Sequence, residues 1–249
     1  MWTKALLKTK FKPTAIHLSL SLVIFAALAY LIVFHWYPVP YFEVDGGWQG
    51  IKIIALVDLV LGPLITFLIF DPAKTRRAIR FDIMVIAVFQ IGALIYGIHT
   101  TYSQRPVAIV LVDDYVFPVT SELYRGTLDS TDQLARFSPE EVPIIYAEYP
   151  TVRDEFAKVM RVKREQKIPE YAQLPLYRDH TAFVKQLKAK QAFFENQLSG
   201  SKQQAAFTTW LEQNEYQQDQ ILIAKFTGRY GQTWLLFAQD GRYIDYVGF

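Results

Sequence analysis

The chain of 249 residues contains no cysteine and only four histidines. The lack of cysteine excludes disulfides, thiolate nucleophiles and cysteine-ligated zinc. The histidines are too scattered along the chain for a metal site, and we interpret each as an amphipathic or solvated side chain. A glycine-rich phosphate loop, a G-x-S-x-G sequence and an H-E-x-x-H sequence are also absent, and each would indicate a class of reaction. The sequence therefore predicts no catalytic, cofactor-binding or metal site, and we expect a protein that is not an enzyme.

A strongly basic region is also absent. The formal net charge is +2, with nine basic and five acidic residues in positions 1–100 and seventeen basic and nineteen acidic residues in positions 101–249. Nucleic-acid-binding domains carry a dense basic patch or stripe. We therefore expect no nucleic-acid partner.

Long apolar runs occur three times, all within residues 1–100. Each run has about 20 residues, which as a helix crosses a hydrocarbon layer about 30 Å thick. The first run ends in aromatic residues without a small-residue cleavage site, so we expect a transmembrane helix and not a signal peptide. The predicted fold is an α-helical membrane part with three transmembrane helices plus an α+β extracytoplasmic domain. Its segments are an N-terminus (1–14), a first helix (15–37), a loop (38–50), a second helix (51–70), a basic loop (71–80), a third helix (81–100) and the domain (101–249).

Lysine and arginine are unevenly distributed among the predicted loops. Residues 1–14 carry four cations, the 38–50 loop carries none, and the 71–80 loop carries four. Cytoplasmic loops of membrane proteins are enriched in lysine and arginine. We therefore expect the N-terminus and the 71–80 loop in the cytoplasm, and residues 101–249 on the outer side of the membrane.

The second apolar run contains an acid, Asp58, and the pair Gly62-Pro63. An ionisable group in hydrocarbon costs several kcal/mol, and a proline within a helix frees a carbonyl group. Asp58 shares one helical face with Ala55, Gly62 and Thr66, which follow the spacing i, i+3, i+7 and i+11. We expect this face to pack against protein.

The third apolar run carries a polar residue, Gln90, at a similar depth to Asp58. In antiparallel helices the two residues fall within roughly one turn of each other, so we expect the Gln90 amide to donate to Asp58. Ala87, Ala93 and Gly97 share the face of Gln90, and we expect this small-residue stripe to pack against the second helix. A direct contact of Asp58 with a partner protein remains the alternative.

Residues 101–249 contain strands at both ends and helices between them. Asp113-Asp114 joins two β-branched runs in 107–120, and Asp240-Gly241 divides the last run, so each position predicts a hairpin. The spacing of apolar residues predicts helices over 151–166, 180–196 and 203–215. We expect the first and last hairpins to share one sheet.

Two motifs carry a resemblance to a known family. VDLVLGPLIT at Val57–Thr66 and YGIHTTYSQRP at Tyr96–Pro106 resemble the type IV pilin accessory proteins of the TfpY/TfpZ-like group. That resemblance implies a bacterial inner-membrane protein with a periplasmic domain that assists its cognate pilin without known catalysis. The two motifs supply seven candidate residues for membrane and partner interaction, and Gln90 is the eighth. The seven are Asp58, Gly62, Pro63, Tyr96, His99, Arg105 and Pro106.

The function that we expect is that of an accessory factor for type IV pilus biogenesis. Its partners would be the major type IV pilin, inner-membrane lipid and, as a further possibility, other pilus assembly proteins. The alternative is a membrane-bound enzyme that modifies pilin, such as a glycosyltransferase. Its catalytic acids would lie in residues 101–249, where the candidates are Asp113, Asp114, Glu140, Glu141 and Asp240.

Overall fold

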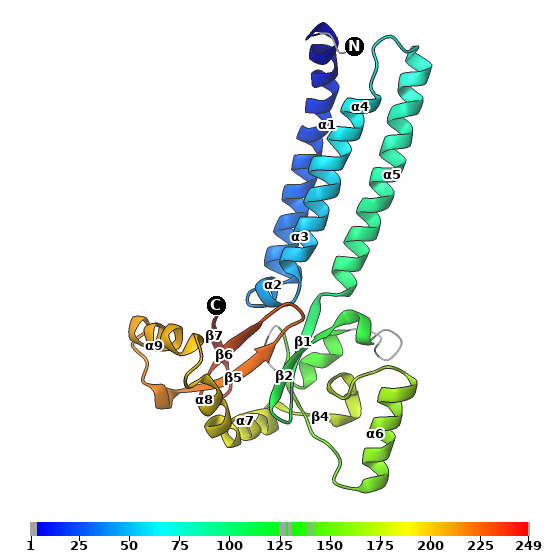
Figure 1. Cartoon of the computed structure of the whole chain (residues 1–249). Helices are drawn as coiled ribbons and strands as arrows, with labels where there is room; N and C mark the ends of the chain where they lie inside the picture. Colours follow the sequence, from blue (N-terminus) through cyan, green and yellow to red (C-terminus); the bar gives the residue numbers. More distant parts are fainter. Residues whose placement is uncertain (1–3, 125–127, 129–130, 139, 141, 249) are drawn as a thin grey trace. The chain divides into compact units, whose positions relative to one another are not determined.

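A computed structural model describes residues 4–124, 128, 131–138, 140 and 142–248 (Figure 1). The chain divides into unit 1, formed by Met1–Phe42 and Gly46–Ser103, and unit 2, formed by Glu43–Asp45 and Gln104–Phe249. Unit 1 is helical, and unit 2 contains a mixed sheet with helices. The expected combination of three long apolar helices and an α+β domain is confirmed.

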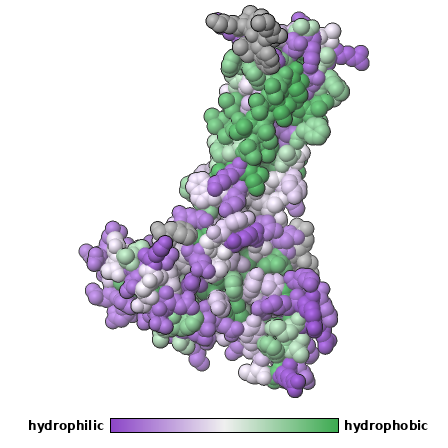
Figure 2. Space-filling view, in the orientation of Figure 1, coloured by the Kyte–Doolittle hydropathy of each residue, from purple (hydrophilic) through white to green (hydrophobic). Residues whose placement is uncertain are grey.

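Unit 1 is built from three helices that are long and apolar enough to cross a membrane, over Lys8–Trp36, Gly47–Ile69 and Arg76–Ser103. Hydrophobic side chains cover most of this unit on the face drawn in Figure 2. Its elements are α1 (Lys4–Leu31), the π-helical turn η1 (Ile32–Trp36), α3 (Gly47–Ala55), the π-helical turn η2 (Leu56–Leu61), α4 (Gly62–Ile69) and α5 (Arg76–Ser103). The short helix α2 (Tyr41–Val44) lies where the chain passes from unit 1 to unit 2.

The second membrane helix consists of α3, η2 and α4, and it is irregular at its centre. The N–H of Gly62 donates to the carbonyl of Val57, five residues earlier, which is the hydrogen bond of a π turn. Pro63 lies in the first turn of α4, where its missing N–H costs little. The second membrane helix is therefore interrupted by a π turn directly before Gly62-Pro63.

Unit 2 is organised around a seven-stranded sheet in the order β4-β3-β1-β2-β5-β6-β7. The pairs β1/β3 and β2/β5 are parallel, and the other neighbours are antiparallel. The strands are β1 (Pro106–Val112), β2 (Tyr115–Thr120), β3 (Ile144–Ala147), β4 (Tyr177–Arg178), β5 (Ile221–Thr227), β6 (Gln232–Ala238) and β7 (Tyr243–Val247). The hairpins β1/β2 and β6/β7 both belong to this sheet, so the first and last hairpins do share one sheet, as expected.

Helices and 3-10 turns cover both faces of this sheet. The helices are α6 (Arg153–Glu165), α7 (His180–Ala189), α8 (Gln191–Leu198) and α9 (Gln203–Gln213). The 3-10 turns are η3 (Ser121–Tyr124), η4 (Thr131–Arg136), η5 (Glu170–Ala172), η6 (Leu174–Leu176) and η7 (Gln218–Gln220). Because both faces are covered, β1 is apolar along its whole length and buried at every position except Val107. Val110 faces a core with Tyr124 and Tyr177, and Phe183 of α7 packs edge-on against Phe237 of β6.

One predicted helix is wrong in its extent. We expected a single helix over 180–196, but the chain bends at Lys190 and divides it into α7 and α8. The side chain of Gln191 both donates to the carbonyl and accepts from the N–H of Ile223 in β5. These two hydrogen bonds fix the start of α8 against the sheet, a constraint that helical periodicity cannot reveal.

Candidate functional site

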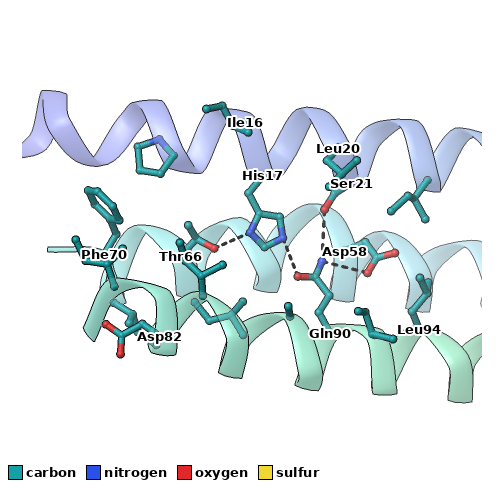
Figure 3. Close-up of a pocket in the computed structure, with 18 residues that line it drawn as sticks. Ile16, His17, Leu20, Ser21, Asp58, Thr66, Phe70, Asp82, Gln90 and Leu94 are labelled. Carbon is teal, nitrogen blue, oxygen red and sulfur yellow. Dashed lines mark hydrogen bonds between the residues drawn. The ribbon is translucent and has the colours of Figure 1, made fainter. Parts of the chain in front are cut away.

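Polar side chains from all three membrane helices meet in the interior of unit 1. His17 and Ser21 come from α1, Asp58 and Thr66 come from the second membrane helix, and Gln90 comes from α5 (Figure 3). We call these five residues the polar cluster. Their surroundings are apolar, so the hydrogen bonds within the cluster have little competition from water.

Gln90 joins the three helices through both ends of its amide group. Its Nε2 donates to Oδ1 of Asp58 and to Oγ of Ser21, each over 3.4 Å. Its Oε1 lies 2.7 Å from Nε2 of His17. The predicted hydrogen bond between Gln90 and Asp58 is therefore confirmed.

His17 has an oxygen atom within hydrogen-bond distance of each ring nitrogen. Nδ1 lies 2.6 Å from Oγ1 of Thr66, and Nε2 lies 2.7 Å from Oε1 of Gln90. The Thr66 hydroxyl already donates its hydrogen to the carbonyl of Gly62 over 3.0 Å, and an amide oxygen can only accept. Nε2 of His17 therefore donates to Oε1 of Gln90. The amide of Gln90 thus links His17 to Asp58.

Asp58 is 2% exposed and only partly satisfied. Oδ1 accepts from Gln90, whereas none of the described residues donates a hydrogen bond to Oδ2. A buried acceptor without a donor costs roughly 1 to 3 kcal/mol, and more when it is charged. Asp58 is therefore a point in unit 1 where a further hydrogen bond would be favourable.

A cavity of about 530 Å³ lies beside the polar cluster, between α1, α4 and α5. Its walls are mainly aliphatic and include Ile16, Leu20 and Ile24 of α1 and Ile83, Ile86 and Leu94 of α5. His17, Asp58, Thr66 and Gln90 also line it. Figure 3 shows α1 and α5 on opposite sides, with the second helix between them. The cavity combines an apolar surface with the polar cluster, and Asp82 of α5 lines it at a separate position.

Lys10 of α1 holds the end of the second membrane helix. Its side chain is 5% exposed, and Nζ donates to the carbonyls of Phe67 and Leu68 over 3.1 and 3.2 Å. The last carbonyls of a helix have no partner within the helix and carry partial negative charge. This cation of the N-terminal segment therefore stabilises the contact between α1 and α4.

The candidate residues of the second helix lie together, as their spacing indicated. Asp58, Gly62, Pro63 and Thr66 are buried. Gly62 permits the approach of Gln90, since a Cβ at this position would lie 2.7 Å from Nε2 of Gln90. This face of the helix packs against protein.

The small-residue stripe that we expected on the third helix is wrong as a packing surface. Ala93 is exposed, and a Cβ at Gly97 would meet nothing within 4 Å. The face of α5 that lines the cavity carries large residues such as Ile86 and Leu94 beside Ala87, the one alanine of the stripe that lies there. Alanine and glycine occur at lipid-facing positions as well as at close helix contacts, so their spacing alone does not identify an interface.

Four other candidate residues lie outside the polar cluster. Tyr96 is 73% exposed, and His99 is exposed on α5. Arg105 accepts the N–H of Ser121 at its carbonyl, and Pro106 begins β1 opposite Thr120. Arg105 and Pro106 thus belong to the start of the sheet in unit 2.

Sequence reasoning missed His17, since our interpretation of every histidine as an amphipathic or solvated side chain is wrong for this residue. It forms two hydrogen bonds inside the helical unit. The available signal was its position within the first apolar run, four residues before Ser21 and therefore on the same helical face. An ionisable residue within a membrane helix indicates a functional or structural site.

Unit 2 contains a second buried carboxylate, Asp45, which is 1% exposed. Oδ1 accepts the N–H of Arg229 over 3.1 Å, and the adjacent carbonyl of Val44 accepts the N–H of Tyr230 over 2.8 Å. A Cβ at Gly228 would lie 2.4 Å from that carbonyl, so glycine is required for this close approach. Burial raises the pKa of Asp45 to about 6, against the opposing effect of the hydrogen bond and charge of Arg229.

The carboxylates of the enzyme alternative have separate structural contacts. Asp114 pairs with Lys190, Oε1 of Glu140 accepts the N–H of Tyr243, and Oδ1 of Asp240 accepts the N–H of Arg242. Asp113 occupies the β1–β2 turn with a φ of 50°. Glu141 lies outside the described residues. Within the described part of the chain, no group of three or more histidine and acidic side chains is arranged to hold a metal ion.

Comparison with known proteins identifies fimbrial assembly proteins as relatives. Residues 5–46 match the family of the fimbrial assembly protein FimB. The fimbrial assembly protein of Dichelobacter nodosus serogroups C1 and C2 is 39% identical over 105 residues, which are 42% of this chain and 80% of that protein. Those of serogroups E1 and I are also 39% identical over 105 residues, and here the match spans 41% of each relative. No solved structure matches the chain.

Proposed function

Because this chain belongs to the family of fimbrial assembly proteins, we propose that it is an inner-membrane accessory factor for type IV pilus biogenesis. It assists the assembly or function of its cognate major pilin through protein contacts and without turnover of a substrate. Lipid of the inner membrane surrounds unit 1, and other pilus assembly proteins are additional partners.

The polar cluster of unit 1 is the observation that carries this proposal. A helix that serves only as an anchor needs no ionisable side chains, because each one costs free energy in hydrocarbon. Here His17 and Asp58 are both placed in the interior of unit 1, beside an apolar cavity. Such an arrangement suits a membrane part that recognises another membrane protein.

The proposed orientation follows from the distribution of cations. The N-terminus and the 71–80 loop lie in the cytoplasm, and residues 101–249 lie in the periplasm. Pilin is held in the inner membrane by an apolar helix and has a periplasmic head. Both parts of the protein are then on the correct side to contact pilin.

Deletion of the gene and photo-crosslinking in living cells test this function. We expect loss or strong reduction of surface pili in the deletion strain and recovery with the intact chain. A photo-crosslinking residue at Tyr115, which is 55% exposed in the β1–β2 hairpin, should capture the major pilin. Normal piliation of the deletion strain, together with no capture of pilin from any position, would refute the proposal.

A pilin-modifying enzyme would need at least one essential carboxylate in unit 2. A hollow of about 610 Å³ lies beside α6 and is lined by Glu148, Glu155, Lys158 and Arg178. Glu148 is already paired with Arg178 over 2.8 Å. We expect Glu148→Gln and Glu155→Gln to leave piliation intact, as should single amide substitutions of Asp113, Asp114, Glu140, Glu141 and Asp240. Loss of piliation in one of these variants, at normal abundance of the protein, would favour catalysis.

A further inference from the structure

The cavity of unit 1 extends as a groove along α5. Ile79 and Leu94 both line it, and fifteen residues of α-helix separate them, which corresponds to about 22 Å. A volume of about 530 Å³ holds several aliphatic side chains, whereas a whole helix is about 10 Å thick. A helix laid along the groove would therefore insert side chains into it.

Asp58 places an acceptor without a hydrogen-bond donor beside this groove. The two amide hydrogens of Gln90 are directed to Asp58 Oδ1 and to Ser21. The two ring nitrogens of His17 face Thr66 and Gln90. Neither residue has a hydrogen left for Oδ2 of Asp58, which lacks a donor among the described residues. An occupant that carries a hydrogen-bond donor would complete the site.

The depth of Asp58 limits where that donor comes from. The residue is eleven positions from each end of the span Gly47–Ile69, or about 16 Å of helix. Half the thickness of the hydrocarbon layer is about 15 Å, so the donors of lipid headgroups remain far from Asp58, and acyl chains carry none. A side chain of a transmembrane helix can both reach the depth of Asp58 and carry a hydrogen-bond donor.

We propose that the groove between α1 and α5 receives a transmembrane helix of the pilus subunit, and that one donor side chain midway along that helix bonds Asp58. This inference rests on the proposed function and adds the place and chemistry of the contact. A small turn of the Asp58 side chain presents Oδ2 to the groove while Oδ1 stays with Gln90. Aliphatic side chains of the partner fill the remaining volume.

Photo-crosslinking from α5 in the intact protein tests the position of the contact. A crosslinking residue at Ile83 lies in the groove, whereas one at Phe89, which is 76% exposed, lies on the same helix away from it. We expect capture of the pilus subunit from position 83 and little or none from position 89. Equal capture from both, or capture of lipid alone from position 83, would overturn the inference.

Two further variants test independently whether the partner helix bonds Asp58 and whether it occupies the groove. Asp58→Asn keeps an acceptor for Gln90 but turns an N–H toward the donor of the partner, so capture from position 83 should fall about tenfold. Ala87→Phe fills the groove from α5 and should also reduce capture, while Ala93→Phe, outside the groove, should not. Unchanged capture in Asp58→Asn and Ala87→Phe would contradict the inference.

The outcomes separate this inference from the function on which it rests. Capture of pilin from Tyr115 in unit 2, with none from position 83, would refute the groove and retain the accessory role. Absence of capture from both positions, with normal piliation of the deletion strain, would refute the accessory role itself.

Discussion

His17 connects α1 to both other membrane helices, because its two ring nitrogens face Thr66 and Gln90. Replacement by leucine leaves the buried oxygen of Gln90 without its donor. Such a loss costs about 1 to 2 kcal/mol, even allowing for the weaker hydrogen bonds measured between membrane helices.

We therefore expect His17→Leu to lower the thermal unfolding midpoint of the detergent-solubilised protein by roughly 2 to 8 °C. His99→Leu is the matched control, because His99 is exposed and no hydrogen bond of its side chain is described. Equal midpoints for the two variants would show that the polar cluster does not stabilise unit 1.

Asp45 should make the stability of the protein depend on pH. Burial raises its pKa from 3.8 to about 6, so between these values the folded state binds more protons than the unfolded state. The free energy of unfolding then falls as pH rises through this window and levels off above pH 6. The full effect is about 3 kcal/mol.

Asp45→Asn removes this dependence and keeps an acceptor for the N–H of Arg229. The free energy of unfolding of the variant, relative to that of the intact protein, should increase between pH 4 and pH 7. Denaturant unfolding at several pH values measures it, and Asp154→Asn on α6 controls for the loss of one exposed charge. A constant difference across this range would contradict the assignment.

At the scale of elements, the contact between α4 and α5 depends on the missing side chain of Gly62. A Cβ there would lie within 3.0 Å of three atoms of the Gln90 amide. Displacing that amide breaks its hydrogen bonds to Asp58 and His17, a loss that exceeds the gain of about 1 kcal/mol from replacing glycine by alanine in a helix.

Gly62→Ala should therefore lower the unfolding midpoint, whereas Gly92→Ala should leave it unchanged or raise it. At Gly92 a Cβ would meet nothing within 4 Å, so only the helix propensity acts. The comparison uses the same substitution in two membrane helices. A higher midpoint for Gly62→Ala would mean that the amide moves aside at little cost.

The sequence was most informative where one residue type conflicts with its surroundings. Asp58 and Gln90 could be predicted because polar groups within apolar runs need partners, and their depths matched. The two hairpins could be predicted because their turns are local. The parallel pair β1/β3 could not, since its strands are joined by a crossover whose path local patterns do not specify. The strand β4 has two residues, too few for any periodicity.

At the scale of the whole molecule, the cation counts predict the orientation in the membrane. A phosphatase fused after Thr101 should be active, because it would be exported to the periplasm. The same enzyme fused near Thr75 should be inactive, because the cations of the 71–80 loop predict that it stays in the cytoplasm. Enzyme assays on cells that carry each fusion measure this directly. Activity only in the fusion near Thr75 would reverse the predicted orientation and contradict the proposed periplasmic contact with pilin.

The π turn η2 determines how many residues can separate Asp58 from Thr66 while both side chains stay on one face of the second membrane helix. In a regular α-helix, positions eight apart, such as Asp58 and Thr66, differ by about 80° around the axis. A π turn rotates the chain less per residue, and this brings both side chains onto the face that meets Gln90 and His17. Removal of one residue between them would give a spacing of seven, which differs by only about 20° in an unbroken α-helix. The helix thus contains one residue more than an unbroken α-helix would need to place Asp58 and Thr66 on one face. Deletion of one residue within η2 should keep these two side chains on the same face, whereas insertion of one residue should move them onto different faces.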